Sequence, residues 1–148
     1  MPHLNARDTA LLLASRAPLD ELLAYRRRMG WGIDWVSSGG SDFNRDLGFQ
    51  HTEDELKPFL ESGEIPLTVE QNAPMCGTDV KGYVTEGPGL SAYVLSDGTA
   101  YRTYVTTARG LEAAMAYYVL LDRTPKGRDE RPDQPLWVRR HDEYESAR

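Results

Sequence analysis

Residues 9–30, TALLLASRAPLDELLAYRRRMG, contain the transition that decides the fold. The uninterrupted apolar run is typical of a β-strand covered on both faces, so we expect a strand from Thr9 to Ser15. Pro18 stands where a helix tolerates proline, acidic side chains follow it, and three arginines precede Gly30. This pattern predicts a helix over residues 18–29. A covered strand followed directly by a helix indicates an α/β fold.

The chain beyond this stretch predicts a second strand and then a hairpin. Residues 31–38 resemble a short strand, which gives the order strand, helix, strand. Two β-rich runs, residues 90–95 and 100–106, flank the dipeptide Asp97-Gly98, which supplies the positive φ angles of a tight hairpin. A threonine at the end of the second run caps a further predicted helix, which ends near Asp122.

Between the second strand and the hairpin the pattern is weak. We expect a long, mostly irregular insertion over residues 42–89, because glycine, proline and asparagine are scattered through it. Thr52 and Glu55 have the spacing of a capping box, which predicts a short helix. Pro58 is expected to interrupt that helix.

The composition is that of one globular domain. The chain has 148 residues, of which 40% are hydrophobic and 27% charged. We expect a single domain over residues 1–148, with its core at about 9–124 and an extended tail at 125–148. Neither a membrane-spanning run nor a secretory signal is visible, so a cytoplasmic location without membrane association is expected. A net charge of −6 disfavours binding to nucleic acid.

Several segments of low degeneracy follow one another between residues 2 and 144. They are Ala14–Pro18, Tyr25–Trp31, Trp35–Ser38, Gly40–Asn44, Ala108–Gly110, Leu121–Glu130 and Trp137–Tyr144. In order and spacing they resemble the thioredoxin-like family called domain of unknown function 899. The resemblance implies an α/β, thioredoxin-like fold, shortened at the amino terminus, with a central mixed sheet, a β-hairpin and flanking helices.

Members of that family usually carry an upstream strand and a helix that begins with a cysteine. That segment would lie before Met1 here. The resemblance therefore implies either a shortened member or an incomplete start. In both cases it implies that the thiol chemistry of the family is not carried by these residues.

Cys76 is the single cysteine, so neither an intrachain disulfide nor a C-x-x-C redox pair can form. A partly exposed thiolate near cations can attack a peroxide or a disulfide, and Lys81 is the nearest cation in sequence. Cys76 is thus the catalytic candidate if the protein is an enzyme, which would then be an oxidoreductase. The alternative is an incidental cysteine in a loop.

A polar loop follows the second predicted strand, and its hydroxyl, amide and backbone groups suit an anion or a small ligand. The candidate ligand-binding residues are Arg16, Ser37, Ser38, Ser41, Asp42, Asn44 and Arg109. The arginines are included because a guanidinium binds a carboxylate or phosphate in a bidentate manner. The alternative is a turn that satisfies its own backbone, with both arginines in structural salt bridges to Asp42, Asp46 or Asp122.

These features favour a scaffold without its own redox pair, which binds a small molecule or a protein partner through residues 37–46. The alternative is a thiol-dependent oxidoreductase of peroxiredoxin or thioredoxin type that uses Cys76 or an upstream segment. The three histidines, His3, His51 and His141, lack metal-ligand spacing, so neither a metal nor another cofactor is expected. An open sheet edge beside the first strand predicts a homodimer.

Overall fold

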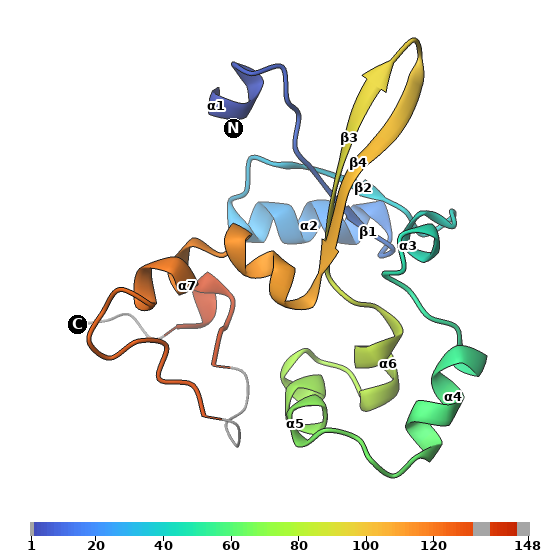
Figure 1. The fold of residues 1–148 in the computed structure, drawn as a ribbon, viewed down its shortest axis with the longest axis vertical. Helices are drawn as coiled ribbons and strands as arrows, with labels where there is room; N and C mark the ends of the chain where they lie inside the picture. The colour runs from blue at the N-terminus through green and yellow to red at the C-terminus, as the bar shows by residue number, and fades with distance from the viewer. Residues whose placement is uncertain (1, 132–136, 145–148) are drawn as a thin grey trace. The chain divides into compact units, whose positions relative to one another are not determined.

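The computed structural model describes residues 2–131 and 137–144 (Figure 1). The chain divides into two compact units, one formed by residues 1–46 with 139–148 and the other by residues 47–138. The expectation that residues 1–148 form a single domain stays a prediction. No described helix is long and apolar enough to cross a membrane.

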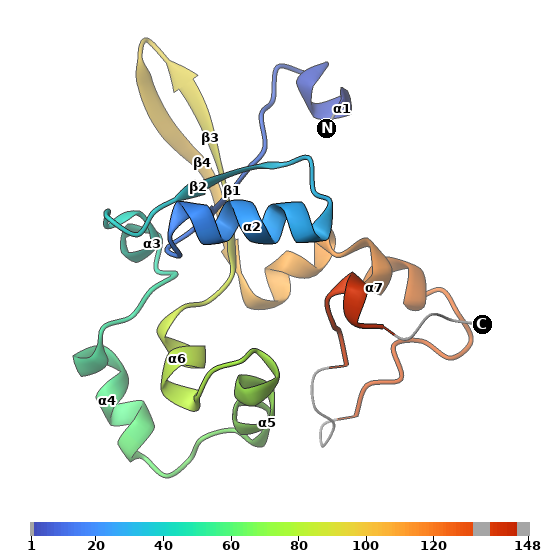
Figure 2. The same cartoon turned by 180° about the vertical axis from the view of Figure 1, so that it is seen from behind.

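The unit that contains the N-terminus is built on two parallel strands, β1 (Leu12–Ser15) and β2 (Asp34–Ser37). The helix α2 (Leu19–Met29) joins them and lies alongside the pair (Figures 1 and 2). Two shorter helices, α1 (Pro2–Asn5) and α3 (Phe43–Asp46), precede and follow these elements. The predicted order of strand, helix and strand is confirmed.

Helix α2 begins and ends close to the predicted positions. Gly30 adopts a φ of 64°, in the left-handed region that glycine tolerates, and Trp31 donates its backbone N–H to the carbonyl of Arg26 at 3.1 Å. Leu22 and Met29 are the buried residues of this helix. The predicted end of the helix at residue 29 is thus confirmed.

The prediction that the first strand is covered on both faces was wrong. Leu11 is 38% exposed and Leu12 is 57% exposed. The reason is the size of the sheet, because β1 pairs only with β2 in the described part of the chain. A two-stranded sheet packed against one helix leaves much of its apolar surface open.

The second unit contains three helices where the sequence predicted a mostly irregular insertion, and that prediction was wrong. These helices are α4 (Glu53–Glu61), α5 (Leu67–Met75) and α6 (Val80–Thr85). The capping box is confirmed, since Thr52 donates its N–H to Glu55 Oε2 at 2.7 Å and accepts from the N–H of Glu55 at 3.3 Å. Pro58 lies inside α4 and does not end it, contrary to expectation.

The predicted hairpin is confirmed. It consists of the antiparallel strands β3 (Gly89–Ser96) and β4 (Thr99–Thr107). Asp97 and Gly98 between them have φ angles of 50° and 77°, as a tight turn requires. The described strands therefore form one parallel and one antiparallel sheet of two strands each, and not the predicted central mixed sheet.

The helix predicted after the hairpin is divided into two shorter elements. A 3₁₀ helix, η1 (Ala108–Ala114), is followed by α7 (Ala116–Leu121), and Met115 between them has φ −101° and ψ 81°. Arg128 packs against both elements. Its guanidinium donates to Asp122 at 2.7 Å and to Glu112 at 3.0 Å, and it lies 4.3 Å from the centre of the Tyr118 ring.

The C-terminal segment 139–144, with the short helix η2 (His141–Glu143), belongs to the first unit and contacts α2. Arg28 binds Asp142 with two hydrogen bonds of 2.7 and 3.1 Å. Arg140 donates to Glu143 at 2.7 Å and to the Tyr25 hydroxyl at 3.1 Å. These hydrogen bonds lower the pKa of both carboxyl groups below their usual values.

We predict that Arg28→Gln releases Asp142. A carboxyl whose pKa is lowered in the folded state stabilises it above the ordinary pKa and loses that effect as the pH falls through the lowered value. In a carboxyl-detected NMR titration, the Asp142 pKa is therefore lower in the parent protein than in Arg28→Gln. Amide exchange of residues 141–144 becomes a few-fold faster in the variant, as expected for the loss of a surface ion pair.

The control for this prediction is Arg27→Gln, which removes the same charge from the neighbouring position on α2. Arg27 is exposed. An equal rise of the Asp142 pKa in both variants would mean that net charge, and not the direct contact, lowers it.

Candidate ligand pocket

A pocket of about 690 Å³ lies within the 47–138 unit. Thirteen described residues line it: Gly48, Phe49, His51, Cys76, Thr78, Gly82, Tyr83, Val84, Glu86, Gly87, Pro88, Thr107 and Ala108. This volume lies inside the range of about 300–1,000 Å³ typical of small-molecule sites. The unit thus has a hollow large enough for a small organic ligand.

Backbone pairing holds two of these walls together. His51 donates its N–H to the carbonyl of Thr85, and Gly87 donates to the carbonyl of Phe49, both at 2.9 Å. An isolated antiparallel bridge joins Gln50 and Glu86 between them. The segment before α4 is therefore fixed to the segment after α6.

Phe49 is the main apolar contribution to this part of the unit. Its side chain is only 8% exposed, and its ring lies directly against Gly89 at the start of β3. A Cβ atom at Gly89 would overlap the ring. Glycine is required here because the ring and the backbone approach more closely than any larger residue permits.

Cys76 lies immediately after α5 and is exposed. Its backbone N–H donates to the carbonyls of Asn72 and Ala73 at 3.0 and 3.1 Å, so the residue is well anchored. Gly77, with a φ of 78°, then turns the chain toward α6. The side chain lines the pocket, which places the predicted catalytic candidate at a defined site.

The nearest cation in sequence is already engaged. Lys81 forms an ion pair of 2.6 Å with Glu53 of α4. This contact ties α6 to α4, and Lys81 is not among the residues that line the pocket with Cys76. The imidazole that lines the pocket belongs to His51, which the sequence analysis considered only as a metal ligand.

The pocket combines apolar surface with a few polar groups. Phe49, Val84 and Pro88 supply apolar contacts, while His51 and Glu86 supply groups that hydrogen-bond or carry charge. Lysine and arginine are absent from the described residues that line it. The lining therefore suits an uncharged or cationic organic molecule better than an anion. Nowhere in the described residues do three or more His, Cys, Asp or Glu side chains form a group able to hold a metal ion.

The polar loop after β2 is held mainly by bonds to itself. Ser38 is buried and donates its hydroxyl to Asn44 Oδ1 at 2.8 Å, and the hydroxyl of Ser41 donates to the carbonyl of Ser38 at 3.1 Å. Ser37 donates to the carbonyl of Ala17 at 2.8 Å. These bonds are those of a turn that satisfies its own polar groups, which is the alternative that the sequence left open.

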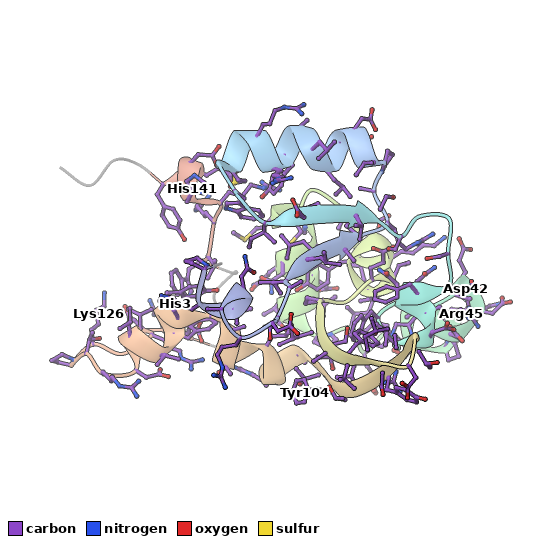
Figure 3. All side chains as sticks on the ribbon, turned by 90° about the horizontal axis from the view of Figure 1, so that it is seen from above. His3, Asp42, Arg45, Tyr104, Lys126 and His141 are labelled. Carbon is purple, nitrogen blue, oxygen red and sulfur yellow. The ribbon has the colours of Figure 1, made fainter. Side chains whose placement is uncertain are left out.

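The remaining loop candidates lie near these residues in the same unit. Asp42 is exposed and lies close to the start of α3 (Figure 3). Arg16 is half-buried at the end of β1, and its carbonyl closely faces Gly39. Arg16 and the candidate residues of the loop 37–46 therefore lie in the same unit. Their role in ligand binding stays a prediction.

Arg109 belongs to the other unit. It pairs with Glu112 one turn further along η1, while Asp122 is bound by Arg128. The guanidinium is 84% exposed. The second arginine of the predicted pair is therefore part of a surface ion pair within the 47–138 unit.

Sequence reasoning missed most of the pocket. Cys76 was identified, but His51, Phe49 and Glu86 come from segments that no motif connects to it. The one available signal was the cluster of Gly82 and Gly87-Pro88. Small residues in a row of turns permit close approach of neighbouring segments, although they do not reveal which segments meet.

A family model described as "Bacterial protein of unknown function (DUF899)" matches residues 1–144. Neither a curated protein nor a solved structure matches the chain.

We predict that Gly89→Ala displaces the Phe49 ring and lowers the free energy of unfolding by about 1–3 kcal/mol, the usual cost of overpacking. Gly87→Ala is the matched control, because a Cβ at that position meets nothing within 4 Å. Its effect should stay within about 0.5 kcal/mol. Urea denaturation of both variants measures the difference, and equal losses of stability would show that the contact with Phe49 is not tight.

Proposed function

The chain belongs to the DUF899 family, and we propose that it is a binding protein whose ligand is a small organic molecule held in the pocket beside Cys76. The observation that carries this proposal is the pocket itself, which joins apolar walls with a few convergent polar groups inside one unit. The proposal keeps the small-molecule function expected from the sequence and moves its site from residues 37–46 to this pocket.

The charge of the lining defines the class of ligand. The carboxylate of Glu86 and the imidazole of His51 favour an uncharged or positively charged molecule that donates hydrogen bonds. Phe49 and Val84 favour a flat or apolar body. Small heteroaromatic compounds and arylalkylamines have both properties.

The loop of residues 37–46 offers weaker support for a binding role. Three of its serine hydroxyls already donate to Ala17, to Asn44 or within the loop. A ligand that used these hydroxyls would have to replace bonds that are already made, at a cost of about 1 kcal/mol for each bond. A ligand that contacts Cys76 in the pocket meets an exposed residue.

One observation favours a second function, a thiol-dependent oxidoreductase. Cys76 is exposed and lines a pocket that also contains an imidazole. In that reaction the thiolate attacks a peroxide oxygen, the O–O bond breaks, and a sulfenic acid and an alcohol or water form. A low-molecular-weight thiol would then reduce the sulfenic acid in two steps. Peroxide consumption that is lost in Cys76→Ser would support this reaction, and equal consumption by both proteins would exclude it.

Three further expectations belong to this proposal. The parallel β1–β2 pair joined by α2, and the hairpin followed by η1 and α7, have the order that the resemblance to a thioredoxin-like fold implies. We also propose that the protein is cytoplasmic and that it forms a homodimer, as the open edge of the first strand suggested.

We predict that indole and benzylamine, at millimolar concentration, shift the amide NMR signals of Gly48, Cys76 and Gly87. Benzoate, an anion of similar size, should shift them much less, because Glu86 is the one formal charge in the described lining. Titration by two-dimensional NMR measures all three responses.

The control uses the cysteine itself. Labelling Cys76 with N-ethylmaleimide fills the pocket and should abolish the response, whereas unlabelled Cys76→Ser should keep it. The absence of shifts at these amides, or an unchanged response after labelling, would contradict the proposed site.

A further inference from the structure

The segment that follows the hairpin departs from the structure that its own sequence favours. Residues 111–121 contain neither glycine nor proline and are rich in alanine, leucine and methionine, which favour an α-helix. Yet η1 keeps 3₁₀ geometry over 7 residues, where runs longer than three or four are uncommon, and Met115 separates it from α7. Figure 1 draws η1 and α7 as separate coils in orange. Such a conflict between local preference and structure is typical of a functional or strained site.

The bent segment, residues 108–121, begins at a strained residue. Ala108 has a φ of 46°, which a residue with a Cβ atom rarely adopts. Gly110 then packs so closely against Thr106 that a Cβ atom on it would overlap the threonine hydroxyl. Strain of this kind persists only where surrounding contacts impose it, and it is concentrated at ligand sites and switch regions.

The strained residue lies in the wall of the pocket. Thr107 and Ala108 both line it. A continuous α-helix over residues 108–121 would require a negative φ at Ala108. It would also shorten the 7 residues of η1 by about 3.5 Å, because the rise per residue falls from about 2.0 to about 1.5 Å. The conformation of the bent segment therefore shapes one wall of the pocket.

One side chain joins both halves of the bent segment. Arg128 binds Asp122, just beyond α7, through Nε and Nη2 at 2.7 and 2.8 Å, and it binds Glu112 of η1 through Nη1 at 3.0 Å. Its side chain is 21% exposed and its guanidinium lies over the Tyr118 ring. A bidentate and largely covered contact of this kind is stronger than an ordinary surface ion pair.

These contacts of Arg128 are possible only in the bent form. In a continuous α-helix, Glu112 and Asp122 would lie about 15 Å apart along the axis. One guanidinium could not then bind both carboxylates at hydrogen-bond distance. Arg128 therefore stabilises the bent form against the continuous helix that the local sequence favours.

We propose that Arg128 is a positioning residue of the pocket, which holds residues 108–121 in the bent form by binding Glu112 and Asp122 together. When these contacts break, the segment becomes one α-helix and withdraws residues 107–108 from their places in the pocket wall. This inference rests on the proposed function, because it concerns the same ligand site. A ligand that fits the pocket binds the bent form, so ligand binding and the Arg128 contacts stabilise each other.

Nuclear Overhauser effects in Arg128→Gln test the change of conformation directly. The distance from Hα of Glu112 to the amide proton of Ala116 is short in an α-helix that runs through Met115, and longer where the helix is interrupted there. We expect this contact to be at least about threefold stronger in Arg128→Gln than in the parent protein, because the population shifts toward the continuous helix. An unchanged contact would overturn the proposal, whatever the affinity of the variant for indole.

Lys126→Gln is the matched control. It removes the same charge from a nearby side chain that is 78% exposed and pairs with Asp129 at 3.0 Å. The Overhauser contact should stay at the parent level in this variant. Equal strengthening in both variants would mean that net charge changes the segment, and would overturn the role of Arg128.

A second substitution should act in the opposite direction. Glycine adopts the φ of Ala108 without strain and disfavours an α-helix, so Ala108→Gly favours the bent form on both counts. Added to Arg128→Gln, it should return the Overhauser contact to near the parent level. A segment that is merely destabilised would not be restored in this way, and failure of the rescue would contradict the proposal.

Titration with indole connects the bent segment to the ligand site. Because only the bent molecules have the pocket wall described above, the apparent dissociation constant rises as their fraction falls. Arg128→Gln should raise it at least about threefold, and Lys126→Gln should leave it unchanged. An unchanged constant in a variant that does straighten would overturn the positioning role. Absence of binding by the parent protein would contradict the proposed function itself, and the Overhauser contact would still decide whether Arg128 holds the bent form.

Asp122→Asn replaces Arg128→Gln if that variant does not fold. It keeps the size of the side chain and removes the charge that Arg128 binds through two nitrogens. The contact between Glu112 and Ala116 should strengthen in this variant too. An unchanged contact would count against the proposal in the same way.

Discussion

The contact between the Phe49 ring and the backbone of Gly89 is the constraint on which the 47–138 unit depends. Phe49 is one of five buried apolar residues in the described structure. Burial of a side chain of this size contributes about 1.5–3 kcal/mol, a large share for a unit with so small a core. The contact joins the segment before α4 to the first residue of β3, and in doing so it forms one wall of the pocket and fixes where the hairpin begins.

The small core explains two further features. Few apolar side chains are fully covered, so ion pairs and aromatic contacts hold the ends of the chain: Arg28 with Asp142, and Arg128 with Asp122 and the Tyr118 ring. Burial raises the pKa of the Tyr118 hydroxyl to about 12. The large apolar residues that the core does not cover are spread along the chain, with Leu12 on β1, Leu120 on α7 and Leu95 on the hairpin among the most exposed.

Local patterns in the sequence predicted the elements that local chemistry determines. Gly30 ends α2, Asp97-Gly98 turns the hairpin, and Thr52 caps α4, because each depends on residues within a few positions. The break at Met115 and the helices α5 and α6 were missed, since such short helices depend on contacts with distant segments. The pocket could not be predicted for the same reason. His51 lines the same pocket as Cys76 because residues 49–51 pair with residues 85–87.

The central claim is that the hollow beside Cys76 is a ligand site and that the exposed hairpin is not. Intermolecular nuclear Overhauser effects from bound indole test it most directly, because they identify the protons that the ligand touches. The account predicts contacts from indole to the Phe49 ring and to the Val84 methyl groups, which both line the pocket. Contacts confined to hairpin side chains such as Tyr101 would show that indole binds an uncovered apolar surface, and would contradict the account.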